Sequence, residues 1–290
     1  MSVDAHQHFW NLEREPLAWL TPEVEAIART FEPAELEPGL VANGIERTVL
    51  VQAACTDSDT DAMLEQAGEH SWIGAVVAWV DLVVPEQARE RLDELMQQPK
   101  VRGVRHAIHD EPDPRWLLQP AVLESIALLE ARGLVLELPC VFPRHLDVVP
   151  ELAAGFPNLP IVIDHLGKPP LGTESMGQWA SLLSRAAAHD NVSAKVSGLN
   201  TMLANPAWTA ADLRPAVEVA VDCFGAERLL CGSDWPVSLL NGSYDRVWQE
   251  TVRVIEDVAP NDVDRLLTGT ATHLYRLEPV SGGGPQWPPR

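Results

Sequence analysis

His6 and His8 stand two residues apart in a short run near the start of the sequence that has the composition of a β-strand. Side chains alternate between the two faces of a strand, so both imidazoles are predicted to leave from the same face, with Asp4 behind them. Val3 and Ala5 would then face the other way, toward covering helices. Two imidazoles on one strand can hold a divalent metal ion or polarise a carbonyl group. A histidine-rich strand without chemistry is the alternative, because His-x-His alone is a weak motif.

Two more candidate residues follow apolar runs far downstream. His165 comes directly after Ile161–Asp164, and Asp234 comes directly after Leu229–Ser233. The alternative for such a histidine is a hydrogen-bonded core residue, and for the aspartate a cap on a following helix. Pro236 disfavours a helix that starts at once, so a functional role is favoured for Asp234.

Glu137, Lys195 and Arg105 are charged residues that also fall within or at the end of apolar runs. A carboxylate that faces the interior of a closed sheet needs a partner, and Lys195 is the predicted ion-pair partner of Glu137. Direct contact between Glu137 and a substrate is the alternative. Arg105 could bind a substrate carboxylate or serve in a structural ion pair.

These residues belong to short β-like runs that alternate with helical patterns along the chain. Eight runs qualify as strands: Val3–His8, Arg47–Ala53, Trp72–Val80, Val101–His106, Leu134–Leu138, Ile161–His165, Val192–Ser197 and Leu229–Ser233. Strands that alternate with helices predict a parallel sheet, and eight of them predict a closed (β/α)8 barrel. An open, doubly wound sheet is the alternative, although no glycine-rich phosphate loop follows the first run.

Helices are predicted between the strands, at Pro85–Gln98, Ala121–Arg132, Trp179–His189 and Arg214–Phe224. Pro85 suits a first helical turn and Gly133 suits the position just past a helix end. The long connection Asn11–Pro38 is predicted to be a lid or wall over the barrel mouth. Residues 1–278 are expected to form a single barrel domain, and the Pro- and Gly-rich residues 279–290 a flexible tail.

The composition limits the possible partners. The chain has 290 residues, enough for one barrel of about 250 residues. Its 21 basic and 42 acidic side chains give a net charge of −21, which argues against nucleic acid or anionic membranes as partners. Cys55, Cys140, Cys223 and Cys231 show no Cys-x-x-Cys spacing and are predicted to be free thiols in a reducing compartment. With no secretory signal and no apolar run of transmembrane length, a soluble cytoplasmic protein is expected.

Six motifs occur in order along nearly the whole chain and together resemble those of the sugar lactonases of the amidohydrolase superfamily. They are Asp4-Ala-His-Gln-His-Phe-Trp10, Thr48-Val-Leu-Val-Gln-Ala53, Gly103-Val-Arg-His106, Asp164-His-Leu-Gly-Lys-Pro169, Lys195-Val-Ser-Gly-Leu199 and Cys231-Gly-Ser-Asp-Trp-Pro-Val237. The group includes L-fuconolactonases and L-rhamnonolactonases. The resemblance implies a (β/α)8 barrel that hydrolyses a sugar-derived lactone.

The resemblance also implies roles for particular residues. His6, His8, His165 and Asp234 match the catalytic and metal-binding set, and Arg105 matches an arginine that contacts substrate in relatives. The superfamily's two-metal members carry a bridging Lys or Glu on strand four and a histidine on strand five. This chain has Arg105-His106 and Glu137 there, so at most one divalent ion, zinc by preference, or none is expected. Substrate contacts are expected from the other residues near the mouth: His106, Gln52, Trp10, Trp19 and Trp235.

Lactone hydrolysis needs a base for the attacking water and positive charge or hydrogen-bond donors for the oxyanion. Asp234 is predicted to be the base, and the three histidines to hold the ion or to polarise the carbonyl directly. Two alternatives are a metal-dependent decarboxylase of the same superfamily and a binding protein that has kept the barrel without turnover. The particular lactone and the oligomeric state, which could be a homo-oligomer, do not follow from the sequence.

Overall fold

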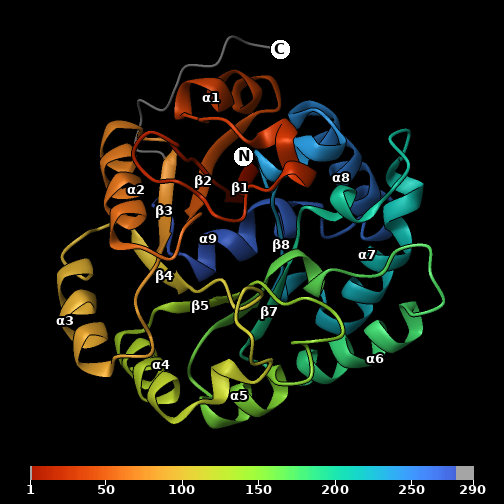
Figure 1. Ribbon diagram of the computed structural model, residues 1–290. Helices are drawn as coiled ribbons and strands as arrows, with labels where there is room; N and C mark the ends of the chain where they lie inside the picture. Colours follow the sequence, from red (N-terminus) through yellow and green to blue (C-terminus); the bar gives the residue numbers. More distant parts are fainter. Residues whose placement is uncertain (1, 279–290) are drawn as a thin grey trace.

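Eight parallel strands form one sheet in the computed structural model, which describes residues 2–278. They follow chain order: β1 Ser2–Gln7, β2 Ile45–Val51, β3 Ile73–Ala78, β4 Val101–Arg105, β5 Val135–Leu138, β6 Ile161–Ile163, β7 Val192–Val196 and β8 Leu229–Cys231. The residues after β8 return to β1, since Gln7 bridges Trp235 in parallel and the Asp234 N–H donates to the His6 carbonyl oxygen at 2.8 Å. The sheet therefore closes on itself (Figure 1), and the predicted (β/α)8 barrel is confirmed.

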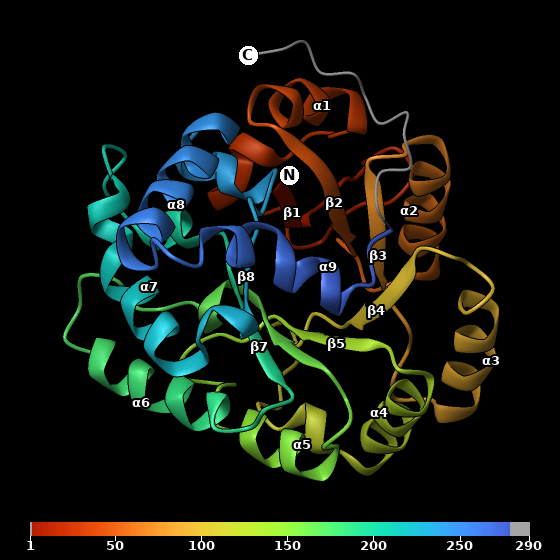
Figure 2. The ribbon, with the colours of Figure 1, turned by 180° about the vertical axis from the view of Figure 1, so that it is seen from behind.

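Helices surround the barrel (Figures 1 and 2). They are α1 Pro33–Ala42, α2 Asp57–Glu69, α3 Pro85–Leu95, α4 Pro120–Arg132, α5 Val149–Gly155, α6 Met176–Ala187, α7 Ala210–Phe224, α8 Tyr244–Val258 and α9 Thr270–Leu274. As predicted, Pro85 begins α3 and Gly133 ends α4, where its φ of 62° is left-handed. Among the described residues, no helix combines the length and apolar character that a membrane crossing requires.

Most strands end one or two residues earlier than predicted, on the side where the polar residues lie. β6 stops at Ile163 because His165 and Leu166 have φ values of 53° and 52°, which no strand accommodates. His8, His106 and Ser197 likewise follow the last residue of their strands. The polar side chains thus stand on the turns that leave the sheet, where they can point into the mouth.

The predicted facing of Val3 and Ala5 is wrong. Both lie in the inner cluster of the barrel, with Val49 and Val77 of the neighbouring strands, rather than against helices. The register between β1 and β2 shifts between Asp4 and Gln7, and this irregularity lets Ala5 and His6 both face inward. Asp4 faces outward instead of sharing a face with His6, and its carboxylate accepts a hydrogen bond from Tyr244 of α8 at 3.1 Å.

The end of the barrel opposite the mouth is closed by the α9 region, which crosses it in Figure 2. Ala271, Tyr275 and Leu277 pack in the same cluster as the inner valines of the strands. Burial of apolar surface contributes about 25 cal/mol per Å², so the packing of the α9 region stabilises the fold. Only the opposite end of the barrel then remains open for an active site. The predicted tail, residues 279–290, lies outside the described residues.

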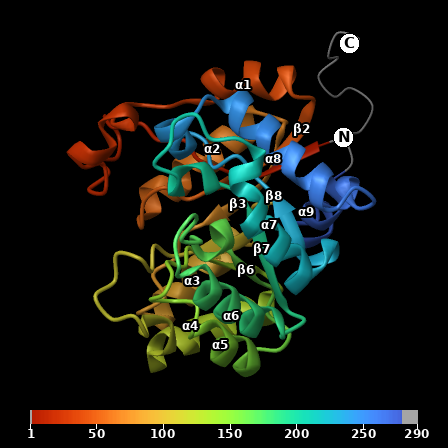
Figure 3. The same cartoon turned by 90° about the vertical axis from the view of Figure 1, so that its right-hand side faces the viewer.

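The long connection after β1 projects from the mouth end, as the side view of Figure 3 shows in red. It contains a 3₁₀ helix at Pro22–Ile27 and returns to α1. Its base is fastened by two backbone hydrogen bonds between Trp10 and Phe31, of 3.1 and 2.8 Å. The indole N–H of Trp19 donates to the carbonyl oxygen of Ala53 at 3.0 Å, which ties the connection to the residues that follow β2.

Candidate active site

A cavity of about 400 Å³ opens at the mouth of the barrel. Its walls come from the turns that follow the strands and from the long connection after β1. Its lining includes His8, Leu17, Trp19, Gln52, Arg105, His109, His165, Lys168, Met202 and Asp234. A cavity of this size at the carboxyl ends of barrel strands is typical of a small-molecule site.

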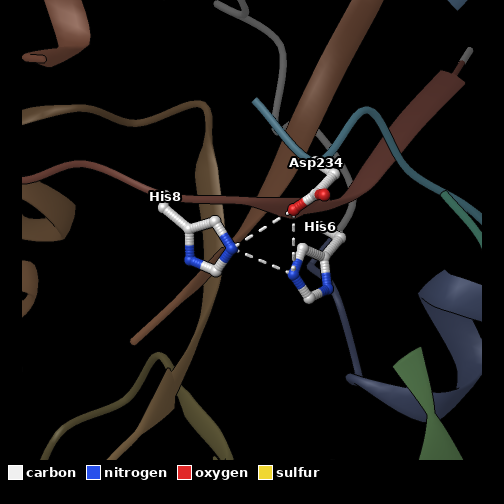
Figure 4. A group of neighbouring side chains, drawn as sticks. All are labelled: His6, His8 and Asp234. Carbon is white, nitrogen blue, oxygen red and sulfur yellow. Dashed lines mark hydrogen bonds and ion pairs between the residues drawn. The ribbon is translucent and has the colours of Figure 1, made fainter. Parts of the chain in front are cut away.

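His6, His8 and Asp234 converge at the end of the barrel (Figure 4), where His8 and Asp234 line the cavity and His6 lies buried behind them. The Nε2 atoms of His6 and His8 lie 3.1 Å apart. Oδ1 of Asp234 lies 3.7 Å from His6 Nε2 and 3.5 Å from His8 Nε2. Nδ1 of His8 lies 2.8 Å from the carbonyl oxygen of Val51, which can only accept, so Nδ1 carries a proton and Nε2 is the atom turned toward Asp234.

His165 completes the group from the turn after β6. Its Nε2 lies 3.8 Å from Oδ1 of Asp234, while its Nδ1 lies 2.9 Å from the hydroxyl of Ser197. The left-handed backbone of His165 and Asp234, with φ values of 53° and 58°, turns both side chains inward. Three histidine Nε2 atoms therefore surround one carboxylate oxygen.

Glycines make room for this group. A Cβ atom at Gly198 would lie 2.5 Å from Oδ2 of Asp234, and one at Gly232 would lie 2.8 Å from Cβ of His6. Side chains do not tolerate contacts this short, so both positions require the absence of a Cβ. This steric requirement explains why the two motifs have glycine at positions 198 and 232.

Asp234 is ionised at neutral pH. Burial by itself would raise the pKa of its carboxyl group, but the surrounding imidazoles of His165, His8 and His6 outweigh burial and hold that pKa below its ordinary value. Burial lowers the pKa of His165, and burial with the charge of Lys195 lowers that of His6, so both imidazoles are neutral. The site thus combines one anionic carboxylate with neutral nitrogen donors.

A network of buried charged side chains lies beneath the histidines, and one of them, Arg105, reaches the cavity. Lys195 Nζ donates to Glu137 Oε2 at 2.6 Å, which confirms the predicted ion pair, and Tyr275 donates to the other oxygen of Glu137. Arg105 donates to Asp164 Oδ2 at 3.1 Å and to the Gln52 carbonyl oxygen at 2.7 Å. Burial raises the pKa of Glu137 to about 7 despite the opposing charge of Lys195. Arg105 is therefore engaged in a structural ion pair, although it also lines the cavity.

The spacing of the donor atoms suits a single metal ion. Four ligands about 2.0–2.2 Å from a tetrahedral zinc ion lie about 3.3–3.6 Å from one another. The distances among His6, His8 and Asp234 run from 3.1 to 3.7 Å, and Nε2 of His165 lies 3.8 Å from the Asp234 carboxylate. A second group, His6 with Asp164 and His165, also has metal-like spacing. It adjoins the ammonium of Lys195, which lies 3.4 Å from Asp164 Oδ1 and would repel a second cation.

The remaining predicted substrate contacts divide into two sets. Trp19, Gln52 and Arg105 line the cavity, whereas Trp10, His106 and Trp235 are absent from its lining. Trp10 is buried, and its indole N–H donates to the Arg29 carbonyl oxygen. Trp235 packs edge-on against Phe9 and Phe31 in the core. His106 stacks on Trp116 and lies 2.7 Å from Glu111, so it fastens the turn after β4.

Several residues of the site were missed from the sequence. His109 and Lys168 line the cavity, and burial with the charges of Lys168 and Arg105 lowers the pKa of His109 to about 3. Asp164 reaches both Arg105 and His6. Its place between an apolar strand and His165 was a usable signal, because that position is a strand end. His109 lies in an irregular turn, where no periodicity marks a residue as facing the mouth.

The sequence profile of the amidohydrolase family, described as "Amidohydrolase", matches residues 3–277 of this chain. The chain belongs to the amidohydrolase family. A curated relative, L-fucono-1,5-lactonase from Burkholderia ambifaria, is 38% identical over 97% of each chain.

Solved structures agree with this assignment. An amidohydrolase from Burkholderia multivorans, crystallised with bound zinc, is 33% identical and superposes with a TM-score of 0.88 over 96% of this chain and 100% of the other. A 5-carboxyvanillate decarboxylase from Sphingomonas paucimobilis shares the fold, with a TM-score of 0.63 over 96% of this chain and 99% of its own. Its identity of 15% supports nothing beyond the fold.

Proposed function

We propose that this amidohydrolase is a lactonase that opens a sugar-derived lactone to its sugar acid. The observation that carries the proposal is the convergence of three histidine Nε2 atoms on the Asp234 carboxylate in the mouth cavity. A relative that is 38% identical along nearly the full length bears the name L-fucono-1,5-lactonase, so an aldono-1,5-lactone is the expected substrate class.

Asp234 serves as the general base. Its carboxylate takes a proton from a water molecule as the water oxygen bonds to the lactone carbonyl carbon. The tetrahedral oxyanion then collapses, the bond from the carbonyl carbon to the ring oxygen breaks, and the proton held by Asp234 passes to that oxygen. The products are a carboxylic acid and a free hydroxyl on the same chain, which ionise to a hydroxy acid anion and one proton.

His8 and His165 line the cavity beside the expected place of the carbonyl oxygen, and His6 lies behind them. A ring that carries its proton on Nε2 stabilises the developing negative charge, a contribution that typically amounts to about 10²–10³-fold in rate for each donor removed. His6, His8 and Asp234 have the chemistry and spacing to hold one divalent ion, with His165 beside them as a further nitrogen donor, and zinc is the proposed identity of that ion. When bound, such an ion supplies Lewis acidity to the carbonyl group.

Substrate selection falls to the cavity walls. Trp19 offers an indole surface of the kind on which sugar rings stack, and Gln52 and His109 offer hydrogen bonds to hydroxyl groups. Leu17 and Met202 make part of the wall apolar, which suits a deoxygenated carbon or the carbon face of a ring. Arg105 forms an ion pair with Asp164 and also lines the cavity.

A panel of aldonolactones in weak buffer with a pH indicator tests this function. Hydrolysis releases one proton per turnover, and L-fucono-1,5-lactone should give acid well above the spontaneous rate, which is measured without enzyme. Dihydroxybenzoates in the same panel, followed by carbon dioxide release, test the decarboxylase alternative. Acid release from no lactone at micromolar enzyme would refute the proposal, and ligand-induced stabilisation without turnover would identify a binding protein.

A further inference from the structure

His6 is held between a proton donor and a proton acceptor on the side of the ring that faces away from the cavity. The ammonium of Lys195 lies 3.0 Å from His6 Nδ1, and Oδ1 of Asp164 lies 3.3 Å from the same atom. All three side chains are fully buried, so no bulk water can substitute for either partner. The ring can satisfy only one of the two at a time, because Nδ1 either carries a proton or offers a lone pair.

In the metal-free protein, the contacts of Nε2 on the opposite side of the ring determine whether Nδ1 of His6 carries the proton. His8 donates its Nδ1 proton to Val51, so a neutral His8 has a bare Nε2 atom, 3.1 Å from Nε2 of His6. These two nitrogens can form a hydrogen bond only if His6 carries its proton on Nε2. Nδ1 of His6 then accepts from Lys195, and Oδ1 of Asp164 is left without a hydrogen-bond partner, as it is in the structure.

A metal ion requires the opposite arrangement. Both Nε2 atoms must then offer lone pairs, so the His6 proton moves to Nδ1, where Lys195 can no longer donate. Asp164 Oδ1, at 3.3 Å, lies within hydrogen-bonding reach of Nδ1, whereas the nearest oxygen of Glu137 lies 3.9 Å away. Lys195 keeps its bond to Glu137 at 2.6 Å in either arrangement.

We propose that Lys195 and Asp164 form a two-position proton switch for His6, in which Lys195 stabilises the metal-free tautomer and Asp164 the metal-binding one. This inference rests on the proposed metal site and goes beyond it. The switch explains how His6 and His8 can be hydrogen-bonded to each other without a metal ion and can still bind a metal ion. Lys195 and Asp164 are positioning residues, because each affects the metal site only by setting which nitrogen of His6 carries the proton.

Nitrogen-15 NMR of protein labelled at histidine reads the tautomer directly, because a protonated and a bare ring nitrogen have well separated shifts. The His6 signals are assigned by their loss in His6→Asn. In metal-free wild-type protein, His6 is expected to carry its proton on Nε2, and one equivalent of zinc should move it to Nδ1. A proton on Nδ1 of His6 before zinc is added, or no change at His6 when zinc binds, would overturn the proposal.

Zinc affinity of two matched variants provides a second readout. Asp164→Asn and Glu137→Gln each replace one buried carboxyl group next to Lys195 with an amide, but only the first removes the acceptor for His6 Nδ1. Loss of such a partner typically costs about 10–100-fold in metal affinity. That loss is expected for Asp164→Asn by calorimetric titration, with Glu137→Gln close to wild type; equal losses would contradict the switch. Absence of zinc binding in wild type would refute both the metal site and the switch. It would not refute lactone hydrolysis, which the acid-release assay tests separately.

Discussion

At the level of single residues, the site depends on keeping one carboxylate charged among neutral imidazoles. The His8 Nδ1–H bond to Val51, the Ser197 contact of His165 and the buried partners of His6 each hold a ring in one orientation. The pKa of Asp234 is lowered, and burial lowers the pKa values of His6 and His165. None of these groups changes its charge in the physiological range.

This arrangement predicts a flat pH profile near neutrality. A base whose pKa lies below its ordinary value stays ionised until the solution is more acid than that value, and histidines with lowered pKa values stay neutral to below about pH 6.5. kcat/KM, measured by pH-stat titration with the spontaneous rate subtracted, is therefore expected to stay constant from about pH 8 down to about pH 6.5. An acid limb centred near pH 6.5 would show that a histidine with an ordinary pKa acts as the base.

At the level of elements, Asp4 joins the first strand to the last. Its Oδ1 accepts from the N–H of Ser233 at 2.8 Å and of His6 at 3.2 Å, and its Oδ2 accepts from the Tyr244 hydroxyl at 3.1 Å. Burial raises the pKa of Asp4 to about 6 despite these hydrogen bonds, against 3.8 when exposed. The folded protein therefore binds a proton at Asp4 more tightly than the unfolded chain, and stability falls as pH rises from about 4 to about 6.

Asp4→Asn should remove this pH-dependent loss. The amide oxygen can keep both backbone N–H partners, and the amide N–H can donate to Tyr244, so no bond need be lost. The free energy of unfolding of the variant should match wild type near pH 4 and exceed it above pH 6, by at most about 3 kcal/mol for a shift of about two units. Urea unfolding at both pH values measures this. Asp4→Ala, which loses all three bonds, should be less stable at both, and a deficit of Asp4→Asn at pH 7 would contradict the assignment.

The wall formed by the long connection after β1 makes a separate prediction. Trp19 lines the cavity and is anchored to Ala53, whereas Trp10 supports it edge-on from the core at 5.2 Å. Trp19→Ala should raise KM for the lactone about 2–10-fold with little change in kcat, because stacking on an aromatic face contributes about 0.5–1.5 kcal/mol. Trp19→Phe, which keeps an aromatic face, should retain most of the affinity. An unchanged KM in Trp19→Ala would remove Trp19 from substrate binding.

The elements also show what could be predicted from the sequence. The eight strands, the capping roles of Pro85 and Gly133 and the Lys195–Glu137 pair follow from alternation, local turn chemistry and the need to pair buried charges. The facing of Val3 and Ala5 was mispredicted because a register shift inside β1 leaves no mark in the residue pattern. His106 and Trp235 fall beside strand ends yet turn away from the cavity, since the direction of a side chain just past a strand depends on turn geometry that spacing does not encode.

At the level of the whole molecule, acidic charge dominates the surface. The chain carries 42 acidic against 21 basic side chains, and many exposed arginines already have carboxylate partners, such as Arg14 with Glu65 and Arg214 with Asp257. The remaining acids repel one another, and this repulsion disfavours the compact state. Salt screens such repulsion over about 10 Å at 0.1 M.

Added salt should therefore stabilise the folded protein. Raising sodium chloride from about 0.01 M to about 0.15 M shortens the screening length from about 30 Å to about 8 Å. Tm at pH 7.5, followed by circular dichroism, is expected to rise by a few degrees, with most of the gain below about 0.15 M. A fall in Tm over this range would mean that the surface ion pairs stabilise the fold more than the excess acidic charge destabilises it.

The central claim is that Asp234 is the base of a lactonase, and kcat of Asp234→Asn on a good aldonolactone substrate tests it most directly. The amide keeps the shape of the carboxylate and loses its basicity, so kcat should fall by about 10²–10⁴-fold while Tm stays within a few degrees of wild type. Asp110→Asn, which changes another carboxylate of the same cavity in the same way, should stay within a few-fold of wild type. An Asp234→Asn enzyme that also turns over within a few-fold of wild type would contradict the mechanism and leave Asp234 a structural residue.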